Sequence, residues 1–344
     1  MWARSVAQRL VRPVGSKLQA RSASLSTAGG GSPTFEAAVE HCSALTKTTE
    51  PDLWLCHAVL PKAKQPAGFV LRAVNIETAR IADAVQDGAA AQLRMQWWKE
   101  GILDALRGGG GAGGNAAKAP NSEIVSARSQ PVLLALAQIA REQRETAGSV
   151  PLSKTWFLKL MDARMRAVTE THVAPRTLAE VEQYSEATYS SLLYLLCEAL
   201  DAGDEGTMHA ASHLGKALGM CVMLRATGHF VQRREIHLPM DLTAKHGLSE
   251  EALLRGEQQD ALVNVVHEIA EAAYNHLLHA RDLTDSVSQA GRGGLRMAVT
   301  VDVFLDRLQR AGFNVFDSRV VNYAHESRMR IGSQLVQKVF RNTY

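Results

Sequence analysis

The sequence is poor in the residues that mark several protein classes. Its 344 residues include only four cysteines, which form no C-x-x-C pair. This usage argues against a disulfide scaffold or a zinc ribbon and predicts buried free thiols in a reducing compartment, at Cys42, Cys56, Cys197 and Cys221. Runs of β-branched residues are scarce and no strand-like alternation persists, which argues against a sheet. No uncharged apolar run approaches the ~18 residues that a membrane-spanning helix needs.

What the sequence does contain favours an all-α protein. Hydrophobic residues make up 46% of the chain, enough for a large core, and helical periodicity runs almost throughout. We predict one domain over residues 34–344, whose helices include 178–200 and 319–341, with a shorter turn near 51–58. The glycine-rich stretch 108–122 is expected to be a flexible loop within it. This stretch lacks the Gly-Lys-Ser/Thr ending of a phosphate-binding loop, which argues against a nucleotide site there.

The N-terminal segment differs from the rest in charge. Residues 1–35 hold five basic residues and no acid, and the start of the chain is amphipathic. We predict a mitochondrial transit peptide over residues 1–26, followed by a linker over 27–33; the alternative is a basic tail of a cytosolic protein. The remaining chain has 33 basic and 35 acidic residues, so its charge gives no reason to expect nucleic acid as a partner.

The best candidate for a ligand-binding motif is a pair of carboxylates, Asp83 and Asp87, preceded by Arg80. On a predicted helix over residues 68–87, the i, i+4 spacing would place both carboxylates on one face, with the arginine one turn earlier. Carboxylate oxygens suit Mg²⁺, and a guanidinium suits a phosphate group. The alternative is an ordinary solvated helix face.

The surroundings of this pair resemble the squalene and phytoene synthase family. Residues 73–83 are similar to the helix that bears the family's first aspartate-rich motif. Residues 214–254 are similar to its second-motif region, with Leu-Gly-Lys-Ala-Leu-Gly at 214–219, Leu-Arg at 224–225 and Gly-Leu-Ser-Glu-Glu-Ala-Leu-Leu at 247–254. The resemblance covers roughly residues 36–320. It implies an isoprenoid (trans-prenyl) synthase-like helical bundle, in which two acidic motifs hold Mg²⁺ ions against a prenyl diphosphate.

When the family's motif residues are compared with this sequence position by position, the resemblance implies that only half of that site is retained. Arg80, Asp83 and Asp87 match the first motif, and Arg225 matches the arginine that precedes the second. The second motif itself is degenerate, because Ala226, His229 and Phe230 stand where the family has Asp, Glu and Asp. We therefore assign no catalytic residue and expect a vestigial metal or diphosphate site, with Asp83 and Asp87 as the only candidate metal ligands.

Further departures lie at positions that form the family's substrate pocket. Gly219 and Val222 replace a glutamine and an asparagine that line it. Glu186, Tyr189 and Ser190 replace a tyrosine, a small residue and a glycine, and that glycine lets the helix bend around the prenyl tail. The resemblance therefore implies a changed pocket as well as a changed metal site.

A narrower branch of the family is more similar. The similarity is carried by residues 93–99, 184–194, 224–227 and 238–241, and it includes Leu-Arg-Ala-Thr in place of Leu-Arg-Asp. That branch implies a protein of the mitochondrial matrix, peripheral to the inner membrane, that serves the assembly of respiratory complex I (NADH dehydrogenase). From the missing acids of the second motif we expect this protein to be non-catalytic. Its expected partners are complex I subunits or assembly intermediates, with a prenyl lipid as a further candidate.

Two alternatives stay open at this point. One is an active Mg²⁺-dependent prenyl-diphosphate transferase, and the other is a stable accessory subunit of a mitochondrial complex. For the assembly role no cofactor is expected, and Mg²⁺ is expected only together with a diphosphate ligand.

Two further groups are weaker candidates. His276 and His279 follow His267-Glu268 without forming H-E-x-x-H, so we interpret them as part of a polar helix face rather than a zinc site. A basic set near the C-terminus could meet acidic lipid or a partner, or be a solvated face; it comprises Arg328, Arg330, Lys338 and Arg341.

Overall fold

The structure is a computed structural model that describes residues 34–85, 87–108, 130–170 and 174–344. In these ranges every regular element is a helix. The predicted transit peptide 1–26, the linker 27–33 and, apart from Gly108, the loop 108–122 lie outside the described residues. None of the described helices is long and apolar enough to cross a membrane.

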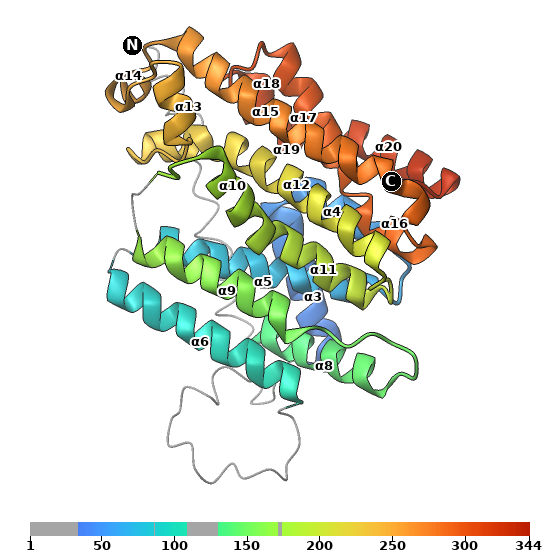
Figure 1. The fold of residues 1–344 in the computed structure, drawn as a ribbon. Coiled ribbons are helices and arrows are strands. Elements are labelled where there is room, and N and C mark those ends of the chain that lie inside the picture. The colour runs from blue at the N-terminus through green and yellow to red at the C-terminus, as the bar shows by residue number, and fades with distance from the viewer. Residues whose placement is uncertain (1–33, 86, 109–129, 171–173) are drawn as a thin grey trace.

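The helices follow one another as an antiparallel bundle (Figure 1). The first group is α3 (Phe35–Thr49), α4 (Pro51–Ala58), α5 (Gln65–Ala84), α6 (Gly88–Arg107), α8 (Pro131–Glu145) and α9 (Lys154–Thr169). The middle group is α10 (Leu178–Ser185), the π-helix η2 (Glu186–Ser190), α11 (Ser191–Ala199) and α12 (Glu205–Gln232). The last group is α13 (Met240–Lys245), α14 (Glu250–Arg255), α15 (Gln259–Asp282), η3 (Thr284–Ser286), α16 (Gln289–Leu295), α17 (Ala298–Arg310), α18 (Ser318–Val321), α19 (Tyr323–Glu326) and α20 (Arg328–Arg341).

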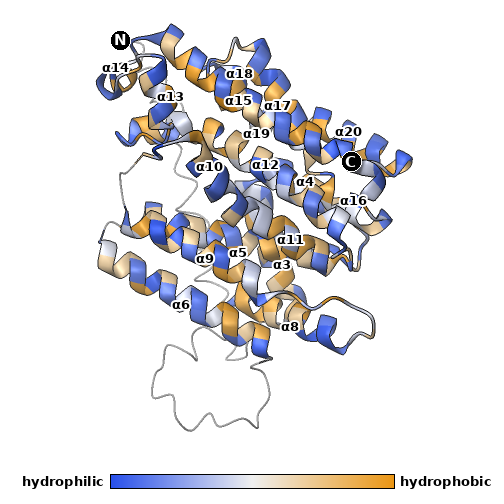
Figure 2. Cartoon of the chain, in the orientation of Figure 1, coloured by the Kyte–Doolittle hydropathy of each residue, from blue (hydrophilic) through white to orange (hydrophobic). Residues whose placement is uncertain are grey.

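The longest helix, α12, lies at the centre. It packs against α10, η2 and α11 on one side and against α15 and α17 on the other, while α5 packs between α3 and α9 (Figure 1). Apolar residues are distributed around the whole of α12, which is the pattern of a helix with no solvent-facing stripe. The outer helices α6 and α20 alternate apolar and hydrophilic faces instead (Figure 2).

Helix starts are set by side-chain caps. Thr34, Thr177, Asp204 and Ser249 each accept a hydrogen bond from a backbone N–H in the first turn of the following helix. Such caps satisfy donors that have no partner inside the helix. The pattern predicted one helix over 319–341, where the structure has the short helices α18 and α19 followed by α20, and a turn near 51–58, where it has α4.

Helix α12 approaches η2 and the end of α10 closely at two glycines. A Cβ atom at Gly215 would lie 2.3 Å from Oγ of Ser190 and 2.4 Å from its Cα, and one at Gly219 would lie 2.4 Å from Oγ of Ser185. Only a residue without a side chain allows this contact with backbone atoms. A continuous helix over 178–200 was predicted; instead its path shifts through a π-turn at residues 186–190, where it meets α12.

The four cysteines are buried free thiols, as predicted. Cys42 lies in α3, Cys56 in α4, Cys197 in α11 and Cys221 in α12, so they are spread through all parts of the core.

Candidate functional site

The carboxylates of Asp83 and Asp87 do not share a helix face. Helix α5 ends at Ala84, Val85 is extended, and Asp87 is the N-cap of α6. One Asp87 carboxylate oxygen accepts a hydrogen bond from the backbone N–H of Ala89 at 3.0 Å. The prediction of one helix over 68–87 is therefore wrong at its C-terminal end, because Asp87 followed by glycine starts a new helix rather than extending the old one.

Asp83 and Arg80 have partners within the protein. Asp83 forms an ion pair with Arg233, whose Nη1 lies 2.7 Å from Oδ1, although the carboxylate remains half-exposed. Arg233 follows the last residue of α12 and also reaches Glu235 through Nε at 3.1 Å. Arg80 donates to the hydroxyl of Thr49 at 2.8 Å. A guanidinium thus occupies the position beside Asp83 where the family resemblance leads us to expect a metal ion.

Arg225 pairs with a buried carboxylate rather than facing α5. Its Nη1 lies 2.6 Å from Oδ2 of Asp52 in α4, and its guanidinium lies 5.2 Å from the ring centroid of Tyr323. The Asp52 side chain is only 2% exposed, and its Oδ1 has no hydrogen-bond partner among the described residues. Burial lowers the pKa of Arg225, but the Asp52 carboxylate and the neighbouring phenols of Tyr323 and Tyr189 together raise that pKa overall. This contact joins α4 to α12 inside the core.

The degenerate second motif presents rings and a methyl group in place of carboxylates. The Phe230 ring packs against His237 with a centroid distance of 3.8 Å, and His229 lies 5.8 Å from Phe230. Ala226 is half-buried and His229 is exposed. An alanine and a phenylalanine offer no atom that can bind Mg²⁺, which requires oxygen ligands.

Sequence reasoning missed a largely buried polar network that joins α5, α9 and α10–η2. It comprises Glu50, Arg72, Asn75, Arg164, Tyr184 and Tyr189. Arg72 donates to both carboxylate oxygens of Glu50, at 2.9 and 2.6 Å, and lies 6.0 Å from the ring of Tyr189. The available signal was Arg72 itself, a charged residue in the middle of the apolar run 66–76.

Arg164 of α9 completes this network. Its guanidinium donates to Oδ1 of Asn75 at 3.0 Å and to the Tyr184 hydroxyl at 2.5 Å. Burial raises the pKa of the neighbouring Tyr189 phenol, with Arg164 opposing that shift. Arginines, tyrosines and an acid therefore occupy the space between α5, α9 and α10–η2, where a hydrocarbon chain would need an apolar lining.

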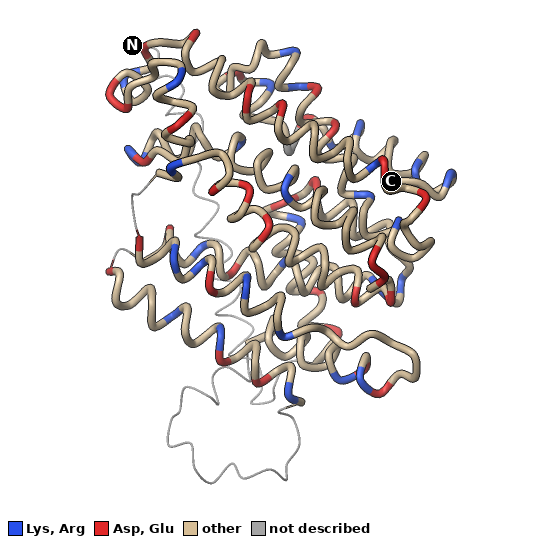
Figure 3. Tube along the Cα trace, in the orientation of Figure 1, with Lys and Arg blue, Asp and Glu red and all other residues tan. Residues whose placement is uncertain are grey.

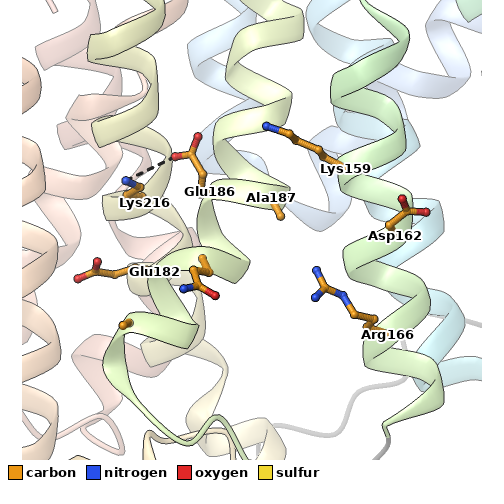
Figure 4. A pocket seen from close by; sticks show the side chains of 9 residues that line it. Lys159, Asp162, Arg166, Glu182, Glu186, Ala187 and Lys216 are labelled. Carbon is orange, nitrogen blue, oxygen red and sulfur yellow. Dashed lines mark ion pairs between the residues drawn. The ribbon is translucent and has the colours of Figure 1, made fainter.

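A surface groove of about 470 Å³ lies outside this network, between α9 and α10–η2. Figure 4 shows Lys159, Asp162 and Arg166 on one wall, facing Glu182, Glu186 and Lys216. The charges alternate, and several are compensated, since Asp162 pairs with Lys99 at 2.7 Å and Glu186 lies 3.8 Å from Lys216. The groove therefore has no field of one sign that would select a diphosphate.

Comparison with known proteins supports the resemblance. The squalene/phytoene synthase family model matches residues 46–324. NADH dehydrogenase (ubiquinone) complex I, assembly factor 6 of Bos taurus is 33% identical over 316 residues, covering 92% of this chain and 84% of the relative. The Homo sapiens protein of the same name is 33% identical and covers 80% of this chain and 75% of the relative.

Solved structures agree on the fold. A dehydrosqualene synthase in complex with ligand superposes with a TM-score of 0.68 at 18% identity, covering 89% of this chain and 98% of that one. A squalene synthase from Alicyclobacillus acidocaldarius gives a TM-score of 0.63 at 16% identity, covering 81% and 96%. The predicted isoprenoid synthase-like helical bundle is confirmed. With a family match over most of the bundle and relatives that cover most of its length, the chain belongs to the squalene/phytoene synthase family.

Proposed function

We propose that this protein is a non-catalytic member of its family that acts in the assembly of mitochondrial respiratory complex I. The observation that carries the proposal is the similarity over 92% of the chain, at 33% identity, to a relative named complex I assembly factor 6. The two prenyl synthases of known structure are only 18% and 16% identical. The chain therefore has more in common with the assembly factors than with these enzymes.

We call the retained residues Arg80, Asp83, Asp87 and Arg225 the half-site. Their charges support the absence of catalysis. Departure of a diphosphate requires positive charge fixed where negative charge develops, and Mg²⁺ ions supply it when facing carboxylates hold them. Here Asp83 already lies 2.7 Å from Arg233, and Asp87 caps α6. The opposite helix presents Ala226 and Phe230. Binding one Mg²⁺ at Asp83 would have to displace a charge-assisted hydrogen bond without gaining a second set of ligands.

The packing of the interior also supports the absence of catalysis. Gly215 and Gly219 bring η2 against α12, and Tyr189 lies buried beside Arg72. A prenyl chain placed there would break buried hydrogen bonds and leave the guanidiniums of Arg72 and Arg164 without their partners. Buried charges without partners cost several kcal/mol each, by the usual order of magnitude. The space that the resemblance assigns to a substrate is therefore more favourably filled by the protein itself.

The C-terminal helix supports a location on the matrix face of the inner membrane. Helix α20 buries Ile331 and Leu335, and on its other side exposes Met329 and Phe340, which are 87% and 86% exposed. Residues 328–341 contain four basic residues and no acid, of which Arg330 pairs with Asp306 of α17; Figure 3 shows the basic positions along this helix. An exposed apolar stripe with flanking positive charge suits the interface of an anionic membrane.

The experiment that tests the assembly role is complementation. Cells that lack the protein are expected to lose assembled complex I on native gels while the other respiratory complexes stay at normal levels. Wild type and Asp83→Asn should restore complex I equally, because the proposed role needs no metal at the half-site. Normal complex I in the deficient cells would contradict the proposal, and co-migration of the protein with the mature complex would favour an accessory subunit.

A separate assay tests the enzymatic alternative. Purified protein with Mg²⁺ is incubated with farnesyl or geranylgeranyl diphosphate, and pyrophosphate release is measured. We expect no release above that of an Asp83→Ala, Asp87→Ala control. Release by wild type that this control abolishes would show that the half-site is active and would overturn the non-catalytic part of the proposal.

The membrane contact is tested with vesicles. Phosphatidylcholine vesicles with anionic lipid should bind the protein, and vesicles without it should bind severalfold less, because the positive charge of α20 contributes to attraction. Phe340→Ser should weaken binding, whereas Leu93→Ser, at an equally apolar position that is 73% exposed on α6, should not. Equal effects of the two substitutions would show that α20 is not the contact.

A further inference from the structure

Four histidines gather where α12 packs against α15, far from the half-site. We call them the histidine cluster: His209 and His213 from α12, and His276 and His279 from α15. The ring centroid of His213 lies 5.2 Å from His209, 5.1 Å from His276 and 5.2 Å from His279. One turn separates the two histidines on each helix, so each helix directs a pair of imidazoles to the same place.

Ring nitrogens in this cluster point at one another. Nδ1 of His213 lies 2.9 Å from Nδ1 of His276, and one nitrogen from each of His213, His276 and His279 lies within 4.8 Å of the other two. At 2.9 Å only one of the two Nδ1 atoms can carry a proton. The other must present a lone pair toward its neighbour, which is the form in which histidine binds a metal.

A carboxylate lies next to the cluster. Nε2 of His276 is 3.6 Å from Oε1 of Glu182 in α10, on the side of the ring opposite to the Nδ1 that faces His213. In metal sites a carboxylate commonly accepts the N–H of a ligating histidine, which fixes its tautomer and orients the other nitrogen toward the metal. Lys216 lies nearby but is directed to Glu186, with its Nζ 3.8 Å from Oε2.

We propose that His213, His276 and His279 form a binding site for a divalent transition-metal ion of the Zn²⁺ type. Three imidazole nitrogens with Glu182 behind one of them match the donors that Zn²⁺ prefers, and a water molecule would complete the tetrahedron. Zinc–nitrogen bonds of ~2.0–2.1 Å in a tetrahedron place the three nitrogens roughly 3.4 Å from one another. Rotation of His279, which is exposed, can bring its nitrogen closer, and the Nδ1 atoms of His213 and His276, which are 2.9 Å apart, would separate slightly.

The site is distinct from the half-site in place and in chemistry. His213 and Arg225 are separated on α12 by roughly 18 Å, at ~1.5 Å per residue. Nitrogen donors select transition metals, whereas the carboxylates of the half-site suit Mg²⁺. An ion bound here would link α12 to α15.

Zinc titration of the full chain tests the proposal. After treatment with a chelator, wild type should take up one Zn²⁺ in competition with a chromophoric chelator, and Mg²⁺ should not compete. His276→Asn and His279→Ala should each weaken binding by at least about 100-fold, the upper end of what is lost when groups around a metal are removed. Glu182→Gln, which keeps all three nitrogens, should weaken it roughly 10-fold.

The matched control is His267→Asn, on the same helix and exposed, with its ring packed against Phe313 instead of the cluster. It should bind Zn²⁺ as wild type does. His279→Ala removes an exposed side chain, so circular dichroism should show a folded protein and its loss of binding can be attributed to the missing ligand. Equal affinity of His279→Ala and His267→Asn, or no zinc uptake by folded wild type, would overturn the proposal.

Discussion

The polar residues in the two halves of α12 differ in how completely their partners satisfy them. Toward its C-terminal end, Arg225 is paired with buried Asp52, and Arg233 just beyond the helix holds Asp83. Toward its N-terminal end, His213 meets His276 and His279 with ring nitrogens that only partly satisfy one another. The first region is the one that the family resemblance points to, yet its charges are neutralised within the protein. In the second region, His276 and His279 were interpreted from the sequence as a polar helix face, yet with His213 they present ring nitrogens that could bind a ligand.

This difference shows that ancestry and present binding capacity are separate properties of a site. A motif can keep its residues while each one acquires a structural partner, as Arg225, Asp83 and Asp87 have done. Residues without motif status can meanwhile be brought together by helix packing. Four expectations test how far the interior and the half-site are structural rather than ligand-binding, and they run from the largest effect to the smallest.

Breaking the buried ion pair should have the largest effect. Asp52→Ala leaves the guanidinium of Arg225 in the core without its carboxylate, and removal of one partner from a buried pair costs about 3–5 kcal/mol. The free energy of unfolding, from urea denaturation monitored by circular dichroism, measures this loss. The double variant Asp52→Leu, Arg225→Met should recover much of it. A single variant as stable as wild type would mean that Arg225 is free to serve a ligand.

Acid should destabilise the protein through His57, which lies on α4 near the buried pair. Burial, and then the charge of Arg72, lower the pKa of His57 from 6.5 to about 3 in the folded state. The unfolded chain therefore binds the proton more tightly, so this stability is fully present above pH 6.5 and is lost as pH falls toward 3. By pH 4 the loss should reach about 3 kcal/mol.

Urea denaturation between pH 7 and pH 4 measures this slope. His57→Asn should flatten it, whatever its effect on stability at pH 7. His267→Asn, at an exposed position, should keep the slope of wild type. An unchanged slope in His57→Asn would show that other groups account for the acid sensitivity.

A side chain added at the contact between α12 and η2 should destabilise the protein. In Gly215→Ala the new Cβ would meet the backbone of Ser190 at 2.4–2.5 Å, and overpacking of this kind costs about 1–3 kcal/mol. Gly228→Ala on the same helix would place its Cβ 3.7 Å from Phe316, an ordinary contact, and should stabilise by about 0.5–1 kcal/mol. Thermal unfolding compares the two, and an equal effect would mean that η2 does not close onto α12.

The smallest effect is expected at Asp83. The Asp83 side chain is half-exposed in its ion pair with Arg233, and exposed ion pairs contribute at most about 1 kcal/mol to the free energy of unfolding. Asp83→Ala should shift the urea midpoint slightly, and high salt should reduce the difference further. If Mg²⁺ with a prenyl diphosphate instead raised the melting temperature of wild type and not of Asp83→Ala, the half-site would still bind its ancestral ligand.

Much of the fold followed from local sequence. Thr34, Asp204 and Ser249 precede helical periodicity and cap the helices that follow, because a side-chain oxygen there satisfies a free backbone N–H. The family resemblance supplied the arrangement of these helices, which the comparison structures confirm. The end of α5 at Ala84 was missed because periodicity alone continues through the Asp-Gly turn at residues 87–88.

What could not be predicted depends on contacts between distant segments. The pairing of Asp52 with Arg225 joins residues 173 positions apart, and His213 meets His276 across 63 positions. The π-turn at residues 186–190 exists where Gly215 allows close approach. Single-sequence patterns describe which face a residue occupies, but they do not say which other face it will meet.

Because the cysteines are buried, their oxidation reports when part of the helical bundle opens. Burial raises the pKa of Cys42, Cys197 and Cys221 to about 12, so almost none of each thiol is present as the reactive thiolate. An alkylating reagent or peroxide can therefore modify the folded chain only when part of the bundle opens. In a compartment that generates oxidants, damage to these cysteines would be limited by how often the bundle opens rather than by the oxidant supply. Mass-resolved thiol labelling, with one cysteine in each of α3, α4, α11 and α12, would show which layer opens first.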